Sequence, residues 1–387
     1  MSVDLATAEA EAALALGRLD GGLGACPASV TRIFAGLVLR TTLTRALAQE
    51  GHAFTDQRFD AWFAGLVPLG DADATRMARS AKVVAAVMLG ELATSSWAPI
   101  AELAQALRPA FIAHRDIAAP DAYQDTHAAV AEARAYMAEL GTGTSPLPFA
   151  ALRRLHERAQ GSTRFAPAES APTTIRLGDR QLTVDRAPAR SPRWAIDLVY
   201  GEHLRATGFL AAALPCPGLV RLDALHDPDG YGAADRPGMA RMMRAEALRD
   251  VALDLFASLA RARQYAALIG ARLSGHRASS RAPALCELLA GFGAMRSAQV
   301  EAVLGATRLG VRGMLDSLLA AGLVARTAVS GVWLYRFVPS APEPEPAPLP
   351  PASFAFSPEA LGAFDAANAE IDRLLARMGI ESDRQEE

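Results

Sequence analysis

Residues 283–338 read PALCELLAGFGAMRSAQVEAVLGATRLGVRGMLDSLLAAGLVARTAVSGVWLYRFV. Apolar residues recur there at three- and four-residue spacing in three short runs, which predicts three helices. Ser297 and Thr307 are expected to cap the second and third helices, because their hydroxyls can accept hydrogen bonds from backbone N–H groups. Gly305 is expected to supply the tight turn between those two helices.

The end of this stretch predicts a β-hairpin. Gly322 stops the third run of apolar residues, since glycine readily adopts the left-handed conformation that ends helices. Strand-like residues then follow over 323–327 and 332–338, on either side of a turn at Ser330-Gly331. The order helix, helix, turn, helix, hairpin is that of a winged helix-turn-helix, which we therefore predict for residues 280–338.

The third helix carries the side chains that DNA recognition would need. A recognition helix lies in the major groove with its N-terminal turn nearest the bases. Arg308 and Arg312 are four residues apart and share one helix face, opposite the expected buried residues Val311 and Leu315. Arginine is the commonest partner of guanine edges, and Leu309 lies beside the two arginines, where it can touch a thymine methyl group.

The distribution of charge agrees with this interpretation. Residues 271–338 contain eight arginines and three acidic residues, a net charge of +5, which leaves −8 for the remainder of a chain whose total is −3. A basic module on an acidic body is typical of DNA-binding proteins. Hydroxyls and N–H groups at helix starts, and the surrounding arginines, are expected to contact phosphates. The candidate DNA-binding residues are Arg277, Arg281, Arg296, Ser297, Thr307, Arg308, Leu309, Arg312 and Arg326.

A second interpretation of the same stretch stays open, because a winged helix can also serve only packing or contacts with proteins. Gly310 and Gly313 weigh against a strong recognition helix, since each glycine costs about 1 kcal/mol relative to alanine within a helix. Glycine also lets another backbone approach closely. The sequence does not decide whether these two glycines weaken the helix or allow a close approach to another backbone.

The remainder of the chain is predicted to be mainly helical. Residues 1–145 have the periodicity of a helical bundle, and residues 146–275 form a second region with a β-hairpin at 174–184. The helices are expected at 4–19, 28–49, 56–66, 73–94, 97–108, 121–140, 152–159, 192–214 and 239–273.

The C-terminal part is expected to leave the folded body. Residues 339–353 are proline-rich and predict an extended linker. Residues 354–387 predict a helix and a charged tail, and Asn368 lies in a heptad seam, where asparagine can fix the register of a two-stranded coil. Because the seam is short, homodimerisation and packing on the protein's own body both remain open.

Composition bounds the class of protein. Apolar residues make up 51% and charged residues 21%, as in soluble globular proteins. The N-terminus carries acidic residues where a secretion signal is basic, and the most apolar stretch, around 83–93, is too short to span a bilayer. The cysteines at 26, 216 and 286 lack metal-ligand spacing. We therefore expect a cytoplasmic protein with reduced thiols, no membrane contact, no metal and no cofactor.

Residues 4–338 resemble a family in their layout. Ala46 to Gly51 (ALAQEG) is similar to the Glu-Gly segment near the start of Fic-related proteins, with Glu50 and Gly51 in its place. Residues 152–156 (LRRLH) are similar to the helix that precedes their hairpin, and 201–208 (GEHLRATG) to their motif helix. The whole resembles an alphaproteobacterial, mostly rhizobial, family of uncharacterised proteins that combine a Fic-like helical region with a C-terminal helix-turn-helix.

That resemblance implies a degenerate Fic-like region. Fic enzymes transfer nucleotide monophosphates with a histidine base and a glycine-rich turn that cradles phosphate. His203 and Gly208 match one histidine and one glycine of that motif, but its acid, its Asn-Gly pair and both arginines are missing. A second match at 226–232 is one residue short and lacks the arginine. The resemblance therefore implies a catalytically inactive body that serves dimerisation, or contact with a partner or ligand.

We expect a mainly α protein with a Fic-like helical bundle, a short hairpin and a C-terminal winged helix-turn-helix. Its expected function is sequence-specific DNA binding as a transcriptional regulator, with DNA as partner and a homodimer as an option. One alternative is a divergent Fic-type nucleotidyltransferase (an AMPylator) that modifies a protein hydroxyl. Another is a protein-interaction scaffold, which would show no DNA binding even at low salt.

Overall fold

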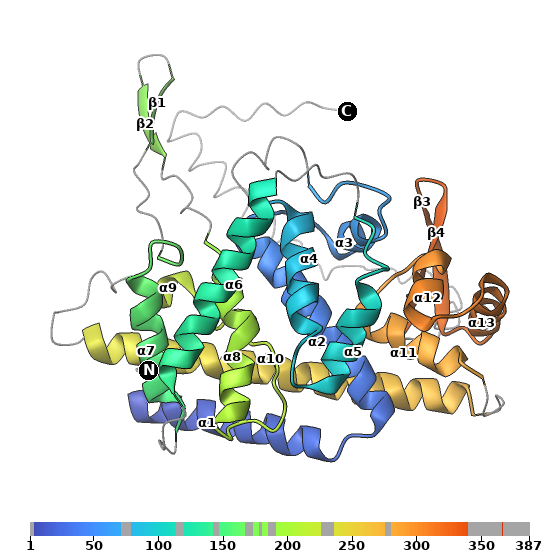
Figure 1. Ribbon diagram of the computed structural model, residues 1–387, viewed down its shortest axis with the longest axis horizontal. Helices are drawn as coiled ribbons and strands as arrows, with labels where there is room; N and C mark the ends of the chain where they lie inside the picture. Colours follow the sequence, from blue (N-terminus) through green and yellow to red (C-terminus); the bar gives the residue numbers. More distant parts are fainter. Residues whose placement is uncertain are drawn as a thin grey trace. The chain divides into compact units, whose positions relative to one another are not determined.

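The computed structural model describes residues 4–70, 79–113, 120–141, 147–166, 173–177, 180–184, 191–225, 236–274, 280–339 and 366 (Figure 1). Its elements are, in chain order, α1 (Leu5–Gly24), α2 (Ala28–Gln49), α3 (Asp56–Phe63), α4 (Ala81–Leu92), α5 (Ala98–Leu107), α6 (Pro120–Leu140), α7 (Phe149–Gln160), β1 (Thr173–Leu177), β2 (Arg180–Val184), α8 (Trp194–Ala206), α9 (Leu222–Leu225), α10 (Arg236–Arg272), α11 (Ala282–Phe292), α12 (Ser297–Leu304), α13 (Arg308–Ala320), β3 (Val324–Val329) and β4 (Val332–Phe337).

The prediction of a mainly helical chain is confirmed. The predicted hairpin at 174–184 is also present, with β1 and β2 antiparallel and Ile175 opposite Leu182. A second antiparallel hairpin joins β3 to β4, with Val324 opposite Phe337. The loop between α11 and α12 extends this second hairpin, because Met295 exchanges backbone hydrogen bonds of 3.0 and 2.8 Å with Tyr335.

Several predicted helices have different bounds; α1, for example, was expected to end at residue 19 and runs to Gly24, and two further differences are larger. The helix expected over 192–214 ends at Ala206, because Gly208 adopts a left-handed φ of 77°. The N–H groups of Gly208 and Phe209 donate back to Arg205 and Leu204, at 3.1 and 2.9 Å, which closes the helix end. The helix expected over 73–94 begins only at Ala81, and its residues 73–78 lie outside the described part of the chain.

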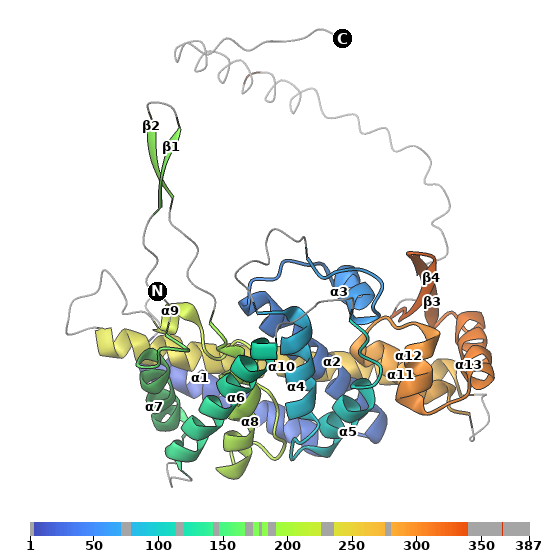
Figure 2. The same ribbon diagram turned by 45° about the horizontal axis from the view of Figure 1, so that its top comes forward.

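The helix α2 is the centre of the core. Its residues from Ile33 to Leu39 are all buried, so the helix is apolar on every side and must be covered on every side. Helices α4, α5, α8, α10 and α11 pack against it. The long α10 also runs along α1, and Figures 1 and 2 show these two helices side by side.

A very close approach of two helix backbones joins α2 to α11. A Cβ atom added at Gly36 would lie 2.7 Å from the backbone carbon of Gly291 and 2.8 Å from its Cα. A Cβ atom added at Gly291 would lie 2.7 Å from the carbonyl oxygen of Ile33. Real side chains do not tolerate such distances, so glycine at both positions lets the two backbones touch.

Further contacts fix α11 and α12 on the helices that precede them. The rings of Phe63 and Phe292 lie 4.8 Å apart, which joins α3 to the end of α11. Arg40 on α2 donates a 2.8 Å hydrogen bond to the carbonyl oxygen of Phe292 and also binds the carboxylate of Asp60. Gln299 on α12 is buried and donates to the carbonyl oxygens of Phe63 and Ala110, at 3.3 and 2.9 Å.

Helices from all three predicted regions, 1–145, 146–275 and 280–338, therefore contribute to one core, and the chain up to Ala341 forms one compact unit. The boundaries between these regions stay predictions from sequence. A second unit spans Pro342–Glu387. Within it the structure describes only Ala366, which is helical, so the predicted linker beyond Pro339 and nearly all of the predicted C-terminal helix lie outside the described residues.

Among the helices that the structure describes, none has both the length and the hydropathy that crossing a membrane requires.

The crossing of α2 and α11 gives the first testable prediction. Gly36→Ala should lower the free energy of unfolding by about 1–3 kcal/mol, because its methyl group overpacks a backbone contact that has no room to give. Urea denaturation followed by circular dichroism measures the change. Gly17→Ala in α1 is the matched control, since a methyl group there meets no atom within 4 Å and should stabilise the helix by up to about 1 kcal/mol. Equal effects of the two substitutions would contradict the close crossing.

Candidate nucleic-acid interface

The turn between α12 and α13 has the local structure that the sequence predicted. Gly305 ends α12 in the left-handed conformation, with φ 55°. The hydroxyl oxygen of Thr307 accepts a 3.3 Å hydrogen bond from the N–H of Gly310 and thereby caps α13. The inner face of α13 buries Val311, Leu315 and Leu318, so the opposite face is directed to solvent.

The two predicted arginines flank the buried face of α13 and do not lie opposite it, contrary to the prediction, because Arg308 is three residues before Val311 and seven before Leu315. Arg308 and Arg312 are both exposed, and the side chain of Arg312 is 81% accessible. The nearest acidic group to Arg312 is Asp316, one turn along, at the weak separation of 4.0 Å. Leu309 between them is 82% exposed, the most exposed large apolar side chain of those described. The start of α13 thus offers two accessible guanidinium groups and one apolar side chain on a rigid helix.

The β3–β4 hairpin lies beside α13 and adds more cationic groups. Its turn is at Ser330-Gly331 as predicted, with φ of 49° and 76° at the two residues. The guanidinium of Arg326 lies 4.6 Å from the ring centroid of Trp333 in a cation–π contact. Trp333, which is 46% exposed, was not among the residues predicted from the sequence. Alternation with the buried Leu334 in a two-stranded hairpin is the signal that places Trp333 on the outer face.

Ser297 does not cap α12, contrary to the prediction. It is the first helical residue, and Arg296 occupies the capping position. There the backbone N–H of Arg296 donates to the side-chain oxygen of Gln299 at 3.1 Å. The physical reason is that the side chain of Gln299 binds two places at once. Its oxygen accepts from the N–H of Arg296, and its amide nitrogen donates to the carbonyl oxygens of Phe63 and Ala110. Arg296 and Ser297 are both half-buried.

The other predicted contact residues divide into two groups. Arg281 is exposed, but its guanidinium also donates to the carbonyl oxygen of Leu304 at the end of α12. It lines an open depression of 650 Å³ beside the start of α13, together with Thr307 and Gly310. Arg277 lies outside the residues that the structure describes.

The positions matched to the Fic motif lie at helix ends or in the interior: Gly51 and Gly208 end helices, and His203 is buried. Gly51 has a φ of 84°, and Gly51 and His52 donate back to α2 in the same manner as Gly208 and Phe209 do to α8. His203 on α8 is 6% exposed, and its Nε2 atom has no hydrogen-bond partner in the described part of the chain. Burial lowers the pKa of its imidazole, as does the charge of Arg154 to a smaller degree.

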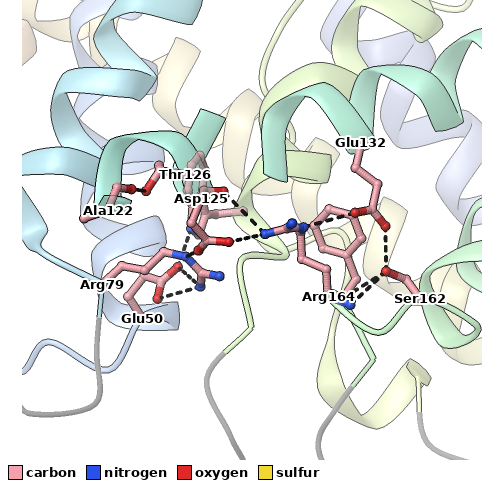
Figure 3. A network of polar contacts seen from close by, with 10 residues as sticks. Glu50, Arg79, Ala122, Asp125, Thr126, Glu132, Ser162 and Arg164 are labelled. Carbon is pink, nitrogen blue, oxygen red and sulfur yellow. Dashed lines mark hydrogen bonds and ion pairs between the residues drawn. The ribbon is translucent and has the colours of Figure 1, made fainter. Parts of the chain in front are cut away.

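Glu50 belongs to a chain of alternating charges, which we call the Asp125 network (Figure 3). The members of the Asp125 network are Glu50, Arg79, Asp125, Arg164 and Glu132. Each arginine binds two carboxylates, and buried Glu50 also accepts a 2.7 Å hydrogen bond from the indole of Trp194. The network joins the end of α2 to α6, α8 and the segment after α7. Its charges are paired with one another, so it holds the body together.

A buried carboxylate that was not predicted from the sequence lies next to this region. Asp197 on α8 accepts hydrogen bonds from the N–H groups of Gly218 and Val220, at 2.7 and 3.0 Å, and from Gln49 at 3.0 Å. Burial raises the pKa of Asp197 and these three donors offset part of that rise, so that the pKa is about 6. The contacts fix the loop after α8. Among the described residues, no group of three or more His, Cys, Asp or Glu could hold a metal ion.

Comparison with known proteins gives no family for this chain. A scan against protein-family models finds none that matches, and a search of curated proteins finds no significantly similar sequence. The arrangement of residues described above is therefore the basis for a proposal of function.

The Asp125 network gives a prediction of acid stability. Partial burial raises the pKa of Asp125, but Arg164 and Arg79 outweigh it and hold the pKa below its ordinary value. The pKa of Glu132 is also lowered, because hydrogen bonds from Tyr136, Ser162 and Arg164 outweigh its partial burial. A carboxyl group with a lowered pKa in the folded state stabilises the fold above its ordinary pKa and loses that effect as the pH falls through the lowered value.

Arg164→Gln should therefore move the midpoint of acid unfolding to higher pH. Titration from pH 7 to pH 2 under circular dichroism measures the midpoint. Arg153→Gln is the control, because Arg153 forms only an exposed pair with Glu157 one turn along α7. If both variants unfold at the pH of the unchanged protein, the network does not stabilise the body.

Proposed function

We propose that residues 280–338 form a winged helix-turn-helix and that this protein is a sequence-specific DNA-binding protein acting as a transcriptional regulator. In this proposal α13 enters the major groove and the β3–β4 hairpin lies against the sugar-phosphate backbone. The observation that carries the proposal is the pair of accessible arginines at the start of α13, Arg308 and Arg312. They flank the buried face of this helix and are themselves exposed, so the protein holds them in place without neutralising them.

The geometry of α13 suits base recognition. Arginine reads guanine through two parallel hydrogen bonds, which needs a guanidinium that is free on its outer edge. Of the two arginines, Arg308 has no ion pair in the described part of the chain, and Arg312 has only the distant Asp316. Gly310 and Gly313 are both exposed, and a Cβ atom at Gly313 would meet nothing within 4 Å. Glycine at these two positions leaves room for a DNA backbone to come close to the helix.

The hairpin and the surrounding charge support non-specific attraction to the duplex. Arg326 and Arg336 are exposed on β3 and β4, and the whole segment 271–338 carries a charge of +5. Such a charge releases counterions from DNA and produces affinity that falls with salt. The helical body, in this proposal, has no catalytic activity and serves dimerisation, or contact with a partner or ligand.

Substitution of the two arginines tests base recognition. Arg308→Ala and Arg312→Ala should each weaken binding to a preferred duplex, selected from random sequence with the purified protein. The expected loss is about 1–3 kcal/mol, or about 5- to 150-fold in Kd, if each arginine reads a base. Fluorescence anisotropy with labelled duplex measures Kd. Arg153→Ala on α7 is the control and should leave Kd unchanged, because α7 and α13 lie at opposite ends of the folded unit (Figure 1).

Wild-type affinity of both variants would show that α13 is not the recognition helix. Absence of any duplex binding at low salt would favour a protein-interaction scaffold.

A hairpin variant separates phosphate contact from base reading. Arg326→Gln should weaken binding to preferred and unrelated duplexes by the same factor and reduce the salt dependence of log Kd by about one counterion. Arg281 is less suitable for this purpose, because its substitution would also remove the hydrogen bond to Leu304. Anisotropy titrations at several salt concentrations measure the slope. A loss confined to the preferred duplex would instead assign a base contact to Arg326.

A further inference from the structure

A cleft lies between the helical body and the proposed DNA-binding region. Its volume is 530 Å³, and its walls are formed by α2 and α5 on one side and by α11 and α12 on the other. Pockets of about 300–1,000 Å³ are the usual size for small-molecule sites in proteins. One wall of the cleft, α12, is followed directly in the chain by α13, which carries the two candidate DNA-binding arginines.

The interior of the cleft is apolar. The side chains of Leu103, Leu288, Val303 and Leu304 line it, and Ala98 lies at its exposed rim. Its floor is near Gly36, where α2 and α11 touch through glycine. An occupant would therefore bury apolar surface against both sets of helices, which is the main source of affinity in such sites.

The charges at the cleft favour a cation. The carboxylate of Glu287 is 5% exposed and accepts a 2.7 Å hydrogen bond from Nε of Arg32, so these two charges neutralise each other. Glu102 is exposed, and it has no hydrogen-bond or ion-pair partner within the described part of the chain. One uncompensated negative charge thus remains at an otherwise apolar cleft. A single protonated amine complements it.

The two sides of the cleft are held in place by different kinds of contact. The contact between α2 and α11 leaves no space for a side chain, since a Cβ atom added at Gly36 or at Gly291 would lie under 3 Å from the backbone of the other helix. The helix α12 is shorter and is held by its ends, through Gln299 at one end and through the contact of Arg281 with Leu304 at the other. Because α12 also packs on α13, a molecule bound against Val303 and Leu304 would contact the element that supports α13.

We propose that this cleft binds a small apolar molecule that carries one protonated amine, and that its occupancy changes the affinity of the protein for DNA. The second half of the proposal rests on the proposed DNA-binding function, whereas the first half stands without it.

Binding is tested on the full chain without DNA. The probes are octylamine, octanol and octanoate, which share an alkyl chain and differ in the charge of the head group. Isothermal titration calorimetry should give binding in the order octylamine, octanol, octanoate. Glu102→Gln should weaken octylamine binding about two- to fivefold, as expected for an exposed ion pair, and leave octanol binding unchanged. Asp121→Asn removes an exposed charge from α6 and is the matched control.

An occluding variant tests the location of the site. Ala98→Trp should fill the cleft from its exposed rim and abolish octylamine binding while leaving the thermal unfolding temperature unchanged. Octylamine that fails to bind at millimolar concentration, octanoate that binds as tightly as octylamine, or binding that persists in Ala98→Trp would each overturn the proposed site.

Coupling to DNA is tested separately. Saturating octylamine should change the Kd for the preferred duplex in the unchanged protein, and should have no effect in Ala98→Trp. If octylamine binds in the cleft and the Kd for DNA stays constant, the coupling is wrong while the site stands. If octylamine binds and no duplex is bound at all, the proposed DNA-binding function fails independently of the cleft.

Discussion

The glycine-to-glycine contact between α2 and α11 is the constraint on which the position of the C-terminal region depends. Gly36 and Gly291 remove the side chains that would otherwise hold two helices apart, and the backbones meet. This contact buries little side-chain surface of its own. The aromatic pair of Phe63 and Phe292 and the bond from Arg40 to the Phe292 carbonyl supply the stabilisation around it. The orientation of α12 and α13 follows, because they continue from a helix that is already fixed on the body.

Electrostatics distinguishes the body from α13. Many arginines of the body pair with carboxylates, as the Asp125 network illustrates, and buried Asp197 accepts hydrogen bonds from two backbone N–H groups and Gln49. The body arginines with an ion pair include Arg32, Arg40, Arg45, Arg79, Arg134, Arg158, Arg164 and Arg249. Arg308 and Arg312 lack such close partners in the described part of the chain. Exposed arginines without an ion pair among the described residues also occur on the body, among them Arg18, Arg205 and Arg261, so what distinguishes Arg308 and Arg312 is that both lie at the start of one helix.

The fold was predicted well where a local signal decides the structure. The apolar periodicity of α2, α11 and α13, the cap at Thr307 and the turn at Ser330-Gly331 all depend on neighbours in sequence, and all are present. The failures have physical reasons. Gly208 ends α8 through backbone conformation, which an apolar pattern does not reveal, and Ser297 loses the capping position because Gln299 takes over the bond to the chain.

The features of the candidate site also differ in whether they could be predicted from the sequence. Arg308 and Arg312 are exposed as predicted, although helical spacing places them beside the buried Val311 and Leu315 and not opposite these residues. The contact of Arg281 with Leu304, the stacking of Arg326 on Trp333 and the cleft beside α12 depend on elements distant in sequence or in different strands. The contact between α2 and α11 joins residues 255 positions apart in the chain, from Gly36 to Gly291, and no local pattern marks the two glycines as partners.

The shared core also affects how this region could be inherited or transplanted. Many recognition modules fold alone and can be exchanged between proteins as independent cassettes. Here the backbone of α11 packs against Ile33 and Gly36 of α2. The ring of Phe292, at the end of α11, packs against the rings of Phe59 and Phe63. Cutting the chain before α11 would expose, on both fragments, apolar surface that is buried in the intact chain. The two halves are therefore expected to evolve together, with substitutions in the first hundred residues compensating for changes near the end of the folded chain.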